Sequence, residues 1–262
     1  MSTYSLEHKE FLKRRKRRKI LIYFTQAFII FILFLIWELL SQANIINTFL
    51  FSSPSSIIKT ISNLITANNF LNHVLVTLYE IFISCSLSLL FGFLIATILW
   101  WNDFTAKVMD PYLTILNSLP KVALGPLIII WVGASTNSII FMSLTISLFI
   151  TIINLYTAFN NTDKNYITLL KSMRSKKGQI YQKIIIRANL KNIISTIKIN
   201  VSMNLIGVIM GELLVSKAGI GYLIMYGSQV FNINLVITSV FLLMVISSIL
   251  YYIIDFFEKK VN

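Results

Sequence analysis

The amino-acid sequence predicts an all-α, polytopic membrane protein with six transmembrane helices. Composition is the first reason: of 262 residues, 56% are hydrophobic and only 13% are charged, whereas a soluble domain carries about 25% charged residues. The mean hydropathy of +0.77 agrees. The other two reasons are apolar stretches of spanning length and an uneven distribution of basic residues. This composition excludes a soluble enzyme, a disordered chain and a secreted disulfide scaffold, and the single cysteine, Cys85, cannot form an internal disulfide.

Six apolar stretches are long enough to cross the hydrocarbon core, which takes about 20 residues of helix. None shows the alternating pattern of a barrel strand. Pro120 and Pro126 interrupt the third stretch, as expected of a helix that lines a cavity rather than lipid. The six stretches are Ile20–Leu40, about Val74–Trp101, about Leu113–Val132, Ser138 to about Ala158, about Ile193–Val215 and about Leu235–Phe257.

Basic residues predict the orientation, because cytoplasmic segments of membrane proteins are enriched in Lys and Arg. With six spans and a cytoplasmic N-terminus, only Lys59 and Lys217 fall on the outer side. We therefore expect residues 1–19 to be a basic cytoplasmic tail, residues 20–262 to form one transmembrane domain, and the C-terminus to be cytoplasmic. The basic run Lys13–Lys19 is interpreted as a topology anchor near acidic lipid headgroups, not as a nucleic-acid site. The cytoplasmic side receives Lys9, Lys13, Arg14, Arg15, Lys16, Arg17, Arg18, Lys19, Lys107, Lys164, Lys171, Arg174, Lys176, Lys177, Lys183, Arg187, Lys191, Lys259 and Lys260.

Two short segments on the outer side have helical signals but are too short to span. Pro54 follows two serines, which is typical of a helix start. The apolar residues after it recur at helical spacing and predict an amphipathic helix packed on the bundle. The segment Lys217–Tyr222 contains two glycines and predicts a turn followed by a re-entrant or amphipathic helix. The apolar residues after Pro54 are Ile57, Ile58, Ile61, Leu64 and Ile65.

The loop at about residues 160–192 predicts a cytoplasmic helical hairpin. Tyr166, Leu169, Leu170 and Met173 occur at i, i+3, i+4 and i+7 and so share one helix face. Tyr181, Ile184 and Ile185 indicate a second helix. An apolar face outside the membrane needs a cover, which is either the ends of the chain's own spans or the groove of another protein.

The sequence lacks the motifs of the common catalytic and metal sites. It has no Walker loop, no His-Glu-x-x-His and no Cys-x-x-Cys, and its two histidines, His8 and His73, lie outside any such pattern. We therefore expect no catalytic residue, metal or cofactor on this chain. Ionisable residues inside the membrane are candidate functional sites, although a paired structural role is the commoner explanation. Glu80, Glu212 and Lys121 are of this kind.

Several of these segments together resemble the membrane permeases of binding-protein-dependent ABC importers, in the nitrate, sulfonate and taurine branch. The resemblance runs from about Phe51 to the C-terminus. Its most specific segment runs from Asp110-Pro111 through Leu119-Pro120-Lys121 and Gly125-Pro126 to Trp131-Val132-Gly133. The segment Glu212-Leu-Leu-Val-Ser-Lys-Ala-Gly219-Ile-Gly221-Tyr222 is nearly as specific. Ser52-Ser53-Pro54-Ser55-Ser56 and His73-Val-Leu-Val-Thr77-Leu78 match the start of the region.

The resemblance implies the MetI-like permease fold and a docking site for an ATPase subunit in the 160–192 loop. The family's Glu-Ala-Ala…Gly docking signature aligns with Thr168-Leu169-Leu170 and Arg174, so its length is kept and its residues are not. We expect Arg174 to lack the backbone freedom of the family glycine, and Gly178 to supply flexibility instead. The implied coupling residues are Tyr166, Thr168, Leu169, Leu170, Met173, Arg174, Gly178 and Tyr181. The candidates for the translocation path are Thr77, Glu80, Pro120, Lys121, Pro126, Gly207, Gly211 and Glu212.

The resemblance also implies the partners and the place of the protein. Two copies of the chain would form the path in a bacterial inner membrane, with ATP bound by a separate cassette ATPase and solute delivered by an extracytoplasmic binding protein. The solute would be a sulfonate, nitrate, taurine or a vitamin precursor. A degenerate permease and an ATP-independent carrier are the alternatives; the carrier predicts repeated halves or intramembrane ion sites. A membrane-embedded enzyme would need clustered acidic or histidine residues at one depth.

Overall fold

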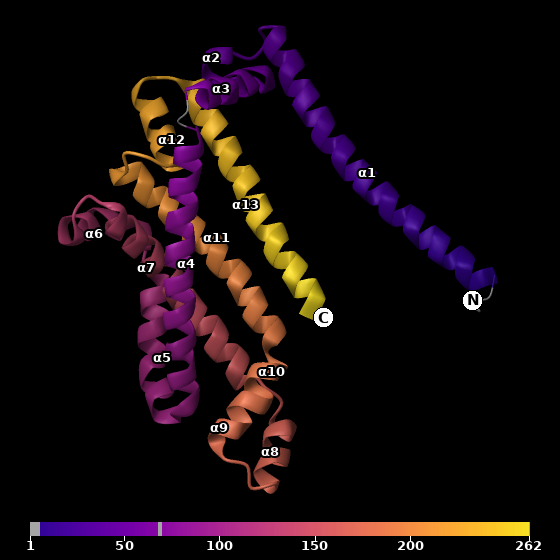
Figure 1. Cartoon of the computed structure of the whole chain (residues 1–262), viewed down its shortest axis with the longest axis vertical. Coiled ribbons are helices and arrows are strands. Elements are labelled where there is room, and N and C mark those ends of the chain that lie inside the picture. Colours follow the sequence, from indigo (N-terminus) through magenta and orange to yellow (C-terminus); the bar gives the residue numbers. More distant parts are fainter. Residues whose placement is uncertain (1–5, 68–69, 262) are drawn as a thin grey trace.

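A computed structural model describes residues 6–67 and 70–261, and every regular element in that part of the chain is helical (Figure 1). Five helices are long and apolar enough to cross a membrane, and the bent pair α5 and α6 brings the number to six when it is counted as one span. The prediction of an all-helical, polytopic fold is confirmed. The five long helices are α1 (Leu6–Gln42), α4 (Phe70–Trp101), α7 (Thr136–Asn160), α11 (Leu190–Val215) and α13 (Ile233–Val261).

The third apolar stretch forms a broken helix rather than one straight span. Helix α5 (Asp103–Ser118) begins ten residues before the expected start and ends just before Pro120. A turn of 3-10 helix (Lys121–Leu124) and helix α6 (Gly125–Val132) follow, at 81° to α5. The break is where the prolines predicted it, because a residue before proline disfavours helical geometry and proline at a helix start does not.

The bundle core is formed by α4, α7 and α11, which pack against one another along much of their lengths. Helix α13 packs on α11, and α12 (Ile220–Gln229) lies against both α13 and α11. In contrast, α1 diverges from the bundle and touches it near one end only (Figure 1), where the rings of Phe34 and Phe241 meet at 6.0 Å. Residues 6–19, which we expected as a separate tail, continue this helix without a break.

The two ends of the bundle carry different short helices (Figure 1). One end, called the α12 end here, holds α2 (Thr48–Phe51), α3 (Pro54–Thr66) and α12. Helix α3 starts as predicted, with Pro54 in its first turn and the Ser53 hydroxyl accepting from the Ser56 N–H at 3.2 Å. The opposite end holds α8 (Lys164–Ser172), α9 (Lys177–Ile180), a π-turn (Tyr181–Ile185) and α10 (Ile186–Ala188), which together we call the hairpin.

Candidate functional site

The hairpin begins with a short helix that is capped at both ends. Asp163 accepts a hydrogen bond from the Asn165 N–H at 2.9 Å and so caps the start of α8. At the other end, the Ser175 N–H donates to the Leu170 carbonyl and the Arg174 N–H donates to the Lys171 carbonyl. This pair of bonds is the Schellman ending of a helix, in which one residue takes a left-handed conformation, usually glycine.

Arg174 is that left-handed residue, with φ at +55°. Arginine therefore takes here the left-handed conformation that glycine usually supplies, and the expectation that it lacks the backbone freedom of glycine stays a prediction. The capping bonds hold the backbone in a conformation that costs a non-glycine residue about 1–2 kcal/mol. Gly178 lies inside α9, and a Cβ there would meet only the Trp101 ring, at 3.6 Å. The expectation that Gly178 supplies flexibility to the hairpin stays a prediction.

Helix α8 exposes one apolar face at the outside of the hairpin. Tyr166, Leu169 and Met173 are 56%, 58% and 69% exposed. Leu170 is half-buried, and Ile167 packs against the core cluster of the hairpin. Thr168 is exposed and donates back to the Lys164 carbonyl at 2.9 Å. The predicted apolar face thus exists, and the chain's own spans do not cover it.

The second half of the hairpin is anchored in the bundle through Tyr181, which is only 9% exposed. Its ring lies 5.0 Å from the Trp100 ring and 5.8 Å from the Phe159 ring, both on long helices. Its hydroxyl shares a hydrogen bond of 2.6 Å with the Thr97 hydroxyl of α4. Burial raises the pKa of the Tyr181 phenol, and the hydrogen bond to Thr97 lowers this pKa by a smaller amount. The phenol is therefore neutral at physiological pH, and the hairpin is tied to α4 and α7.

A buried polar network joins the three core helices and was not singled out from the sequence. Asn200 of α11 donates to Ser88 of α4 at 2.8 Å and to Thr151 of α7 at 2.7 Å. Asn204, one turn further along, donates to the Asn200 side chain and accepts from Ser143 at 2.8 Å. All five side chains are fully buried. Such hydrogen bonds stabilise the association of membrane helices, because separation of the helices would leave unpaired polar groups in hydrocarbon.

Glycines bring α11 and α7 close together beside this network. A Cβ on Gly207 would lie 2.4 Å from Ser143 Cα, and one on Gly211 would lie 3.0 Å from Ile139 Cα. Both contacts are with backbone atoms, which cannot move aside. Of the two roles that small residues allow, close helix contact and a channel wall, the structure realises the first for Gly207 and Gly211.

A second buried cluster lies near the α12 end, where α4 and α11 meet α12. The Thr77 hydroxyl of α4 donates to the Glu212 carboxylate of α11 at 2.6 Å, and the Gly221 N–H of α12 donates to its other oxygen at 2.5 Å. Glu80 lies one turn beyond Thr77 on α4. The exposed fractions of Thr77, Glu80 and Glu212 are 0%, 0% and 1%. These three path candidates face neighbouring helices in this conformation, which agrees with the structural role that intramembrane ionisable residues more often have.

The remaining path candidates lie at the break between α5 and α6. Pro120 and Pro126 are exposed, and Lys121 is half-buried. The Lys121 ammonium donates to the Asn117 carbonyl at 2.7 Å and lies 5.9 Å from the centre of the Phe149 ring. The break therefore places the Lys121 ammonium between the Asn117 carbonyl and the face of the Phe149 ring. The Lys121 side chain is accessible from outside the bundle.

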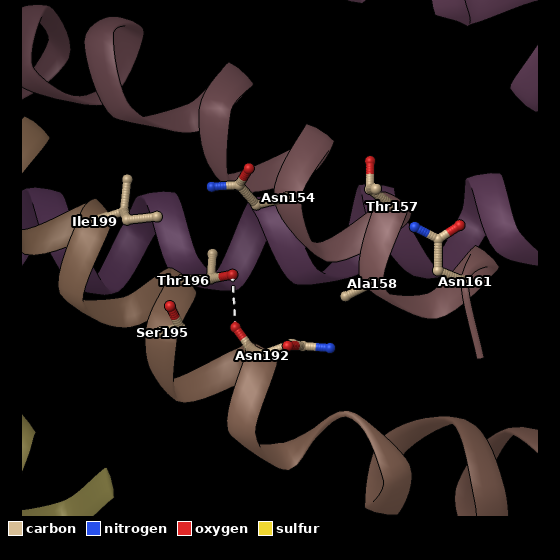
Figure 2. Close-up of a pocket in the computed structure, with 8 residues that line it drawn as sticks. All are labelled: Asn154, Thr157, Ala158, Asn161, Asn192, Ser195, Thr196 and Ile199. Atoms are coloured by element: carbon tan, nitrogen blue, oxygen red, sulfur yellow. Dashed lines mark hydrogen bonds between the residues drawn. The ribbon is translucent and has the colours of Figure 1, made fainter. Parts of the chain in front are cut away.

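A polar cavity of about 350 Å³ opens between α7 and α11, close to the hairpin (Figure 2). Its lining has no charged side chain, and six of the eight lining residues carry an amide or a hydroxyl. Figure 2 shows the Asn154 amide turned into this space. The lining residues are Asn154, Thr157, Ala158, Asn161, Asn192, Ser195, Thr196 and Ile199. In the described part of the chain, no group of three or more His, Cys, Asp or Glu residues could hold a metal ion.

Comparison with proteins of known sequence gives relatives along most of the chain. A probable ABC transporter permease protein of Haemophilus influenzae is 29% identical over 87% of this chain and 92% of its own length. The formylaminopyrimidine transport permease protein ThiX of Halalkalibacterium halodurans is 28% identical over 72% and 75%. The putative aliphatic sulfonates transport permease protein SsuC of Bacillus subtilis is 24% identical over 86% and 82%.

The fold is also similar to that of a solved transporter. A chain of the MetNI methionine ABC transporter in an inward-facing conformation matches with a TM-score of 0.63 and 17% identity, covering 72% of this chain and 94% of that one. This likeness confirms the MetI-like fold. The family model described as the inner membrane component of binding-protein-dependent transport systems matches residues 88–262. In such a system the membrane chain is a transport subunit, and ATP hydrolysis belongs to a separate subunit. Since the matched region is more than half of the chain, this protein belongs to the family of inner membrane components of binding-protein-dependent transport systems.

Proposed function

We propose that this chain couples an ATPase subunit to a path for a small polar solute, and that the exposed face of α8 is the docking element. The observation that carries the proposal is the uncovered apolar face of Tyr166, Leu169 and Met173, at the tip of a hairpin anchored to α4 and α7. A short amphipathic helix seated in a partner's groove is a common mode of recognition. Because Tyr181 fixes the hairpin to the long helices, displacement of α8 would move those helices as well.

The orientation and the assembly belong to the same proposal. The hairpin end faces the cytoplasm, where basic residues concentrate, and the α12 end faces the binding protein. Two copies pair along the α11 face that carries Asn192, Ser195, Ile199, Ser202 and Ile206, spaced at helical intervals. Ser195 and Ser202 are exposed within a spanning helix, and polar side chains at that depth face a partner helix or water rather than lipid.

The solute path is proposed to run along this face of α11 and past the cavity of Figure 2. Amides and hydroxyls there offer both donors and acceptors but no fixed charge. The relatives include permeases named for formylaminopyrimidine and for aliphatic sulfonates, and the nitrate import permease protein NrtB of Synechococcus elongatus is 23% identical over 58% of this chain. We propose a small polar solute of this range, with selectivity set mainly by the external binding protein.

A pair of matched substitutions tests the docking proposal. Leu169→Asp puts a charge on the apolar face of α8. Thr168→Asp puts the same charge one position away, about 100° around the helix. The resemblance aligns Thr168 with the family signature, but the proposed docking face of Tyr166, Leu169 and Met173 leaves Thr168 out. Co-purification from mild detergent should retain the cassette ATPase with Thr168→Asp and lose it with Leu169→Asp, while both variants insert in the membrane. If Leu169→Asp retains the ATPase, α8 does not dock it, and a carrier without an ATPase becomes the better interpretation.

A cross-linking experiment tests the pairing of copies. In a Cys85→Ser background, Ser202→Cys on α11 should form an intermolecular disulfide. Ser86→Cys, on an exposed position of α4, should not. Both serines lie near the middle of their helices, so their depths are comparable. Equal cross-linking at both positions would indicate random collision and would remove the support for this dimer face.

A further inference from the structure

The cluster near the α12 end contains two carboxyl groups but no cation. Glu80 and Glu212 are 0% and 1% exposed. Glu80 lies one helical turn from Thr77 on α4, and the Thr77 hydroxyl donates to Glu212 at 2.6 Å, so the two carboxyl groups are neighbours. Among the described residues, neither forms an ion pair with a Lys, an Arg or a His. Two adjacent anions buried together are strongly unfavourable, because each loses its hydration and both repel.

Glu212 is equipped to be the charged member of the pair. Its oxygens accept the Thr77 hydroxyl at 2.6 Å and the Gly221 N–H at 2.5 Å. Gly221 lies in the first turn of the ten-residue helix α12, whose start favours a negative charge. The backbone before α12 approaches this carboxylate closely. Gly219 has φ at +114°, and a Cβ on Gly219 would clash with the Glu212 carboxyl group.

Glu80 has the opposite surroundings. Both of its carboxyl oxygens are buried and receive no hydrogen bond from any donor in the described part of the chain. The nearby Ser84 hydroxyl donates to the Glu80 backbone carbonyl instead. An ionised carboxylate without a donor is costly in such a place. A neutral carboxylic acid carries its own donor, and the Glu212 carboxylate beside it is the available acceptor.

The other titratable groups at this end do not supply the missing positive charge. His73 of α4 accepts the Gly219 N–H on its Nδ1 at 3.0 Å, so the imidazole that makes this bond is neutral. Two lysines at this end are exposed, Lys217 in the loop after α11 and Lys59 of α3, and Lys59 lies near Glu38 of α1. Tyr222 of α12 stacks on His73 with ring centres 5.8 Å apart.

We propose that Glu80 and Glu212 bind one proton between them, with Glu80 as the neutral acid that donates its O–H to the Glu212 carboxylate. Thr77 extends this hydrogen-bond network to α12, because its hydroxyl donates to Glu212 and also accepts the Ile220 N–H at 2.9 Å. The proton completes a set of bonds that fastens the start of α12 to α4. Release of the proton at alkaline pH leaves two adjacent anions, which repel and loosen α12 from α4. This site stands apart from the α8 docking proposal, since it lies at the opposite end of the bundle.

Infrared spectroscopy of the full chain in lipid bilayers tests the proton directly. At neutral pH the wild type should show a carboxylic acid C=O band that shifts in deuterated water. Glu80→Gln should lose this band, whereas Glu212→Gln should keep it, because the acid is on Glu80. Absence of the band in the wild type, or its loss in Glu212→Gln but not in Glu80→Gln, would overturn the assignment.

Thiol labelling tests the consequence for α12. Ala218→Cys, in a Cys85→Ser background, reports access to the segment before α12. The labelling rate of this cysteine is measured in the protein that keeps Glu80 and in the protein that also carries Glu80→Gln. The ratio of the first rate to the second should rise with pH, by at most about tenfold per pH unit for one released proton. The glutamine cannot ionise and can still donate, so it is the matched control. A ratio that stays constant with pH contradicts the proposal, and one that responds instead to sodium, potassium or magnesium assigns the site to a metal cation.

Discussion

The hydroxyl groups of Tyr181 and Thr97 share a hydrogen bond of 2.6 Å that joins the hairpin to α4. The residues are separated by more than 80 positions in the chain, and the bond lies among the rings of Trp100, Trp101 and Phe159. Polar and aromatic contacts therefore hold the hairpin on two long helices at once. A rigid joint of this kind is what the proposed coupling of an ATPase to the spans requires.

Substitution of Tyr181 should separate the hydrogen bond from the packing. Tyr181→Phe removes only the bond to Thr97 and should lower the free energy of unfolding by about 1 kcal/mol. Tyr181→Ala also empties the ring's site and should cost about 3–5 kcal/mol, as large aromatic truncations do. Thermal unfolding in detergent measures both. Equal losses for the two variants would mean that the ring contributes nothing to anchoring.

Arg174→Gly should stabilise the hairpin by about 1 kcal/mol, because glycine adopts the left-handed conformation without strain. ATPase activity coupled to transport should be maintained or raised. Arg174→Ala is the control: it removes the same charge but keeps the strained backbone, so it should not stabilise. A complete loss of coupled activity in Arg174→Gly, with normal folding, would show that the guanidinium itself contacts the partner.

Substitution of a glycine by alanine should lower the free energy of unfolding in the core but not in the hairpin. Gly207→Ala forces a Cβ to within 2.4 Å of Ser143 Cα and should separate α11 from α7. We expect a loss of at least about 2 kcal/mol, as for overpacked cores. Gly178→Ala meets only the Trp101 ring at 3.6 Å and should be neutral or stabilising by up to about 1 kcal/mol. The unfolding midpoints of the two variants in detergent decide whether the close contact between α11 and α7 requires glycine at position 207.

Single cysteines at the two ends of the bundle test the orientation. Lys176→Cys at the hairpin and Lys217→Cys at the α12 end, both in a Cys85→Ser background, occupy exposed positions. A membrane-impermeant thiol reagent applied to intact cells should label position 217 and leave position 176 unlabelled until the cells are opened. Labelling of both positions from the same side would contradict six spans.

Much of the fold could be predicted because spanning helices are specified by local composition. The helix starts near Pro54 and Pro120 were also predictable, since proline restricts its own backbone and that of its neighbour. The angle of 81° between α5 and α6 was not, because it depends on packing with other helices. The left-handed Arg174 could not be predicted either, since two capping bonds override the preference of arginine for other conformations.

Long-range polar contacts were the main features that the sequence did not predict. Asn200 and Asn204 lie in an apolar stretch, and only the packing of three helices brings serines and a threonine to them. Glu80 and Glu212 could be selected as intramembrane acids, but their meeting depends on the pairing of α4 with α11. A similar case is Lys198, which lies inside an apolar stretch of α11 and pairs with Asp255 of α13 at 2.7 Å.

A photo-crosslinking amino acid at position 173 tests the central claim, that the exposed face of α8 is covered by an ATPase subunit. Met173 at the hairpin and Ile58 at the opposite end are both 69% exposed, so position 58 is a matched control. After irradiation of native membranes and mass spectrometry, position 173 should cross-link to a cassette ATPase and position 58 should not. Cross-links from position 173 to lipid or to another copy of this chain alone would contradict the claim.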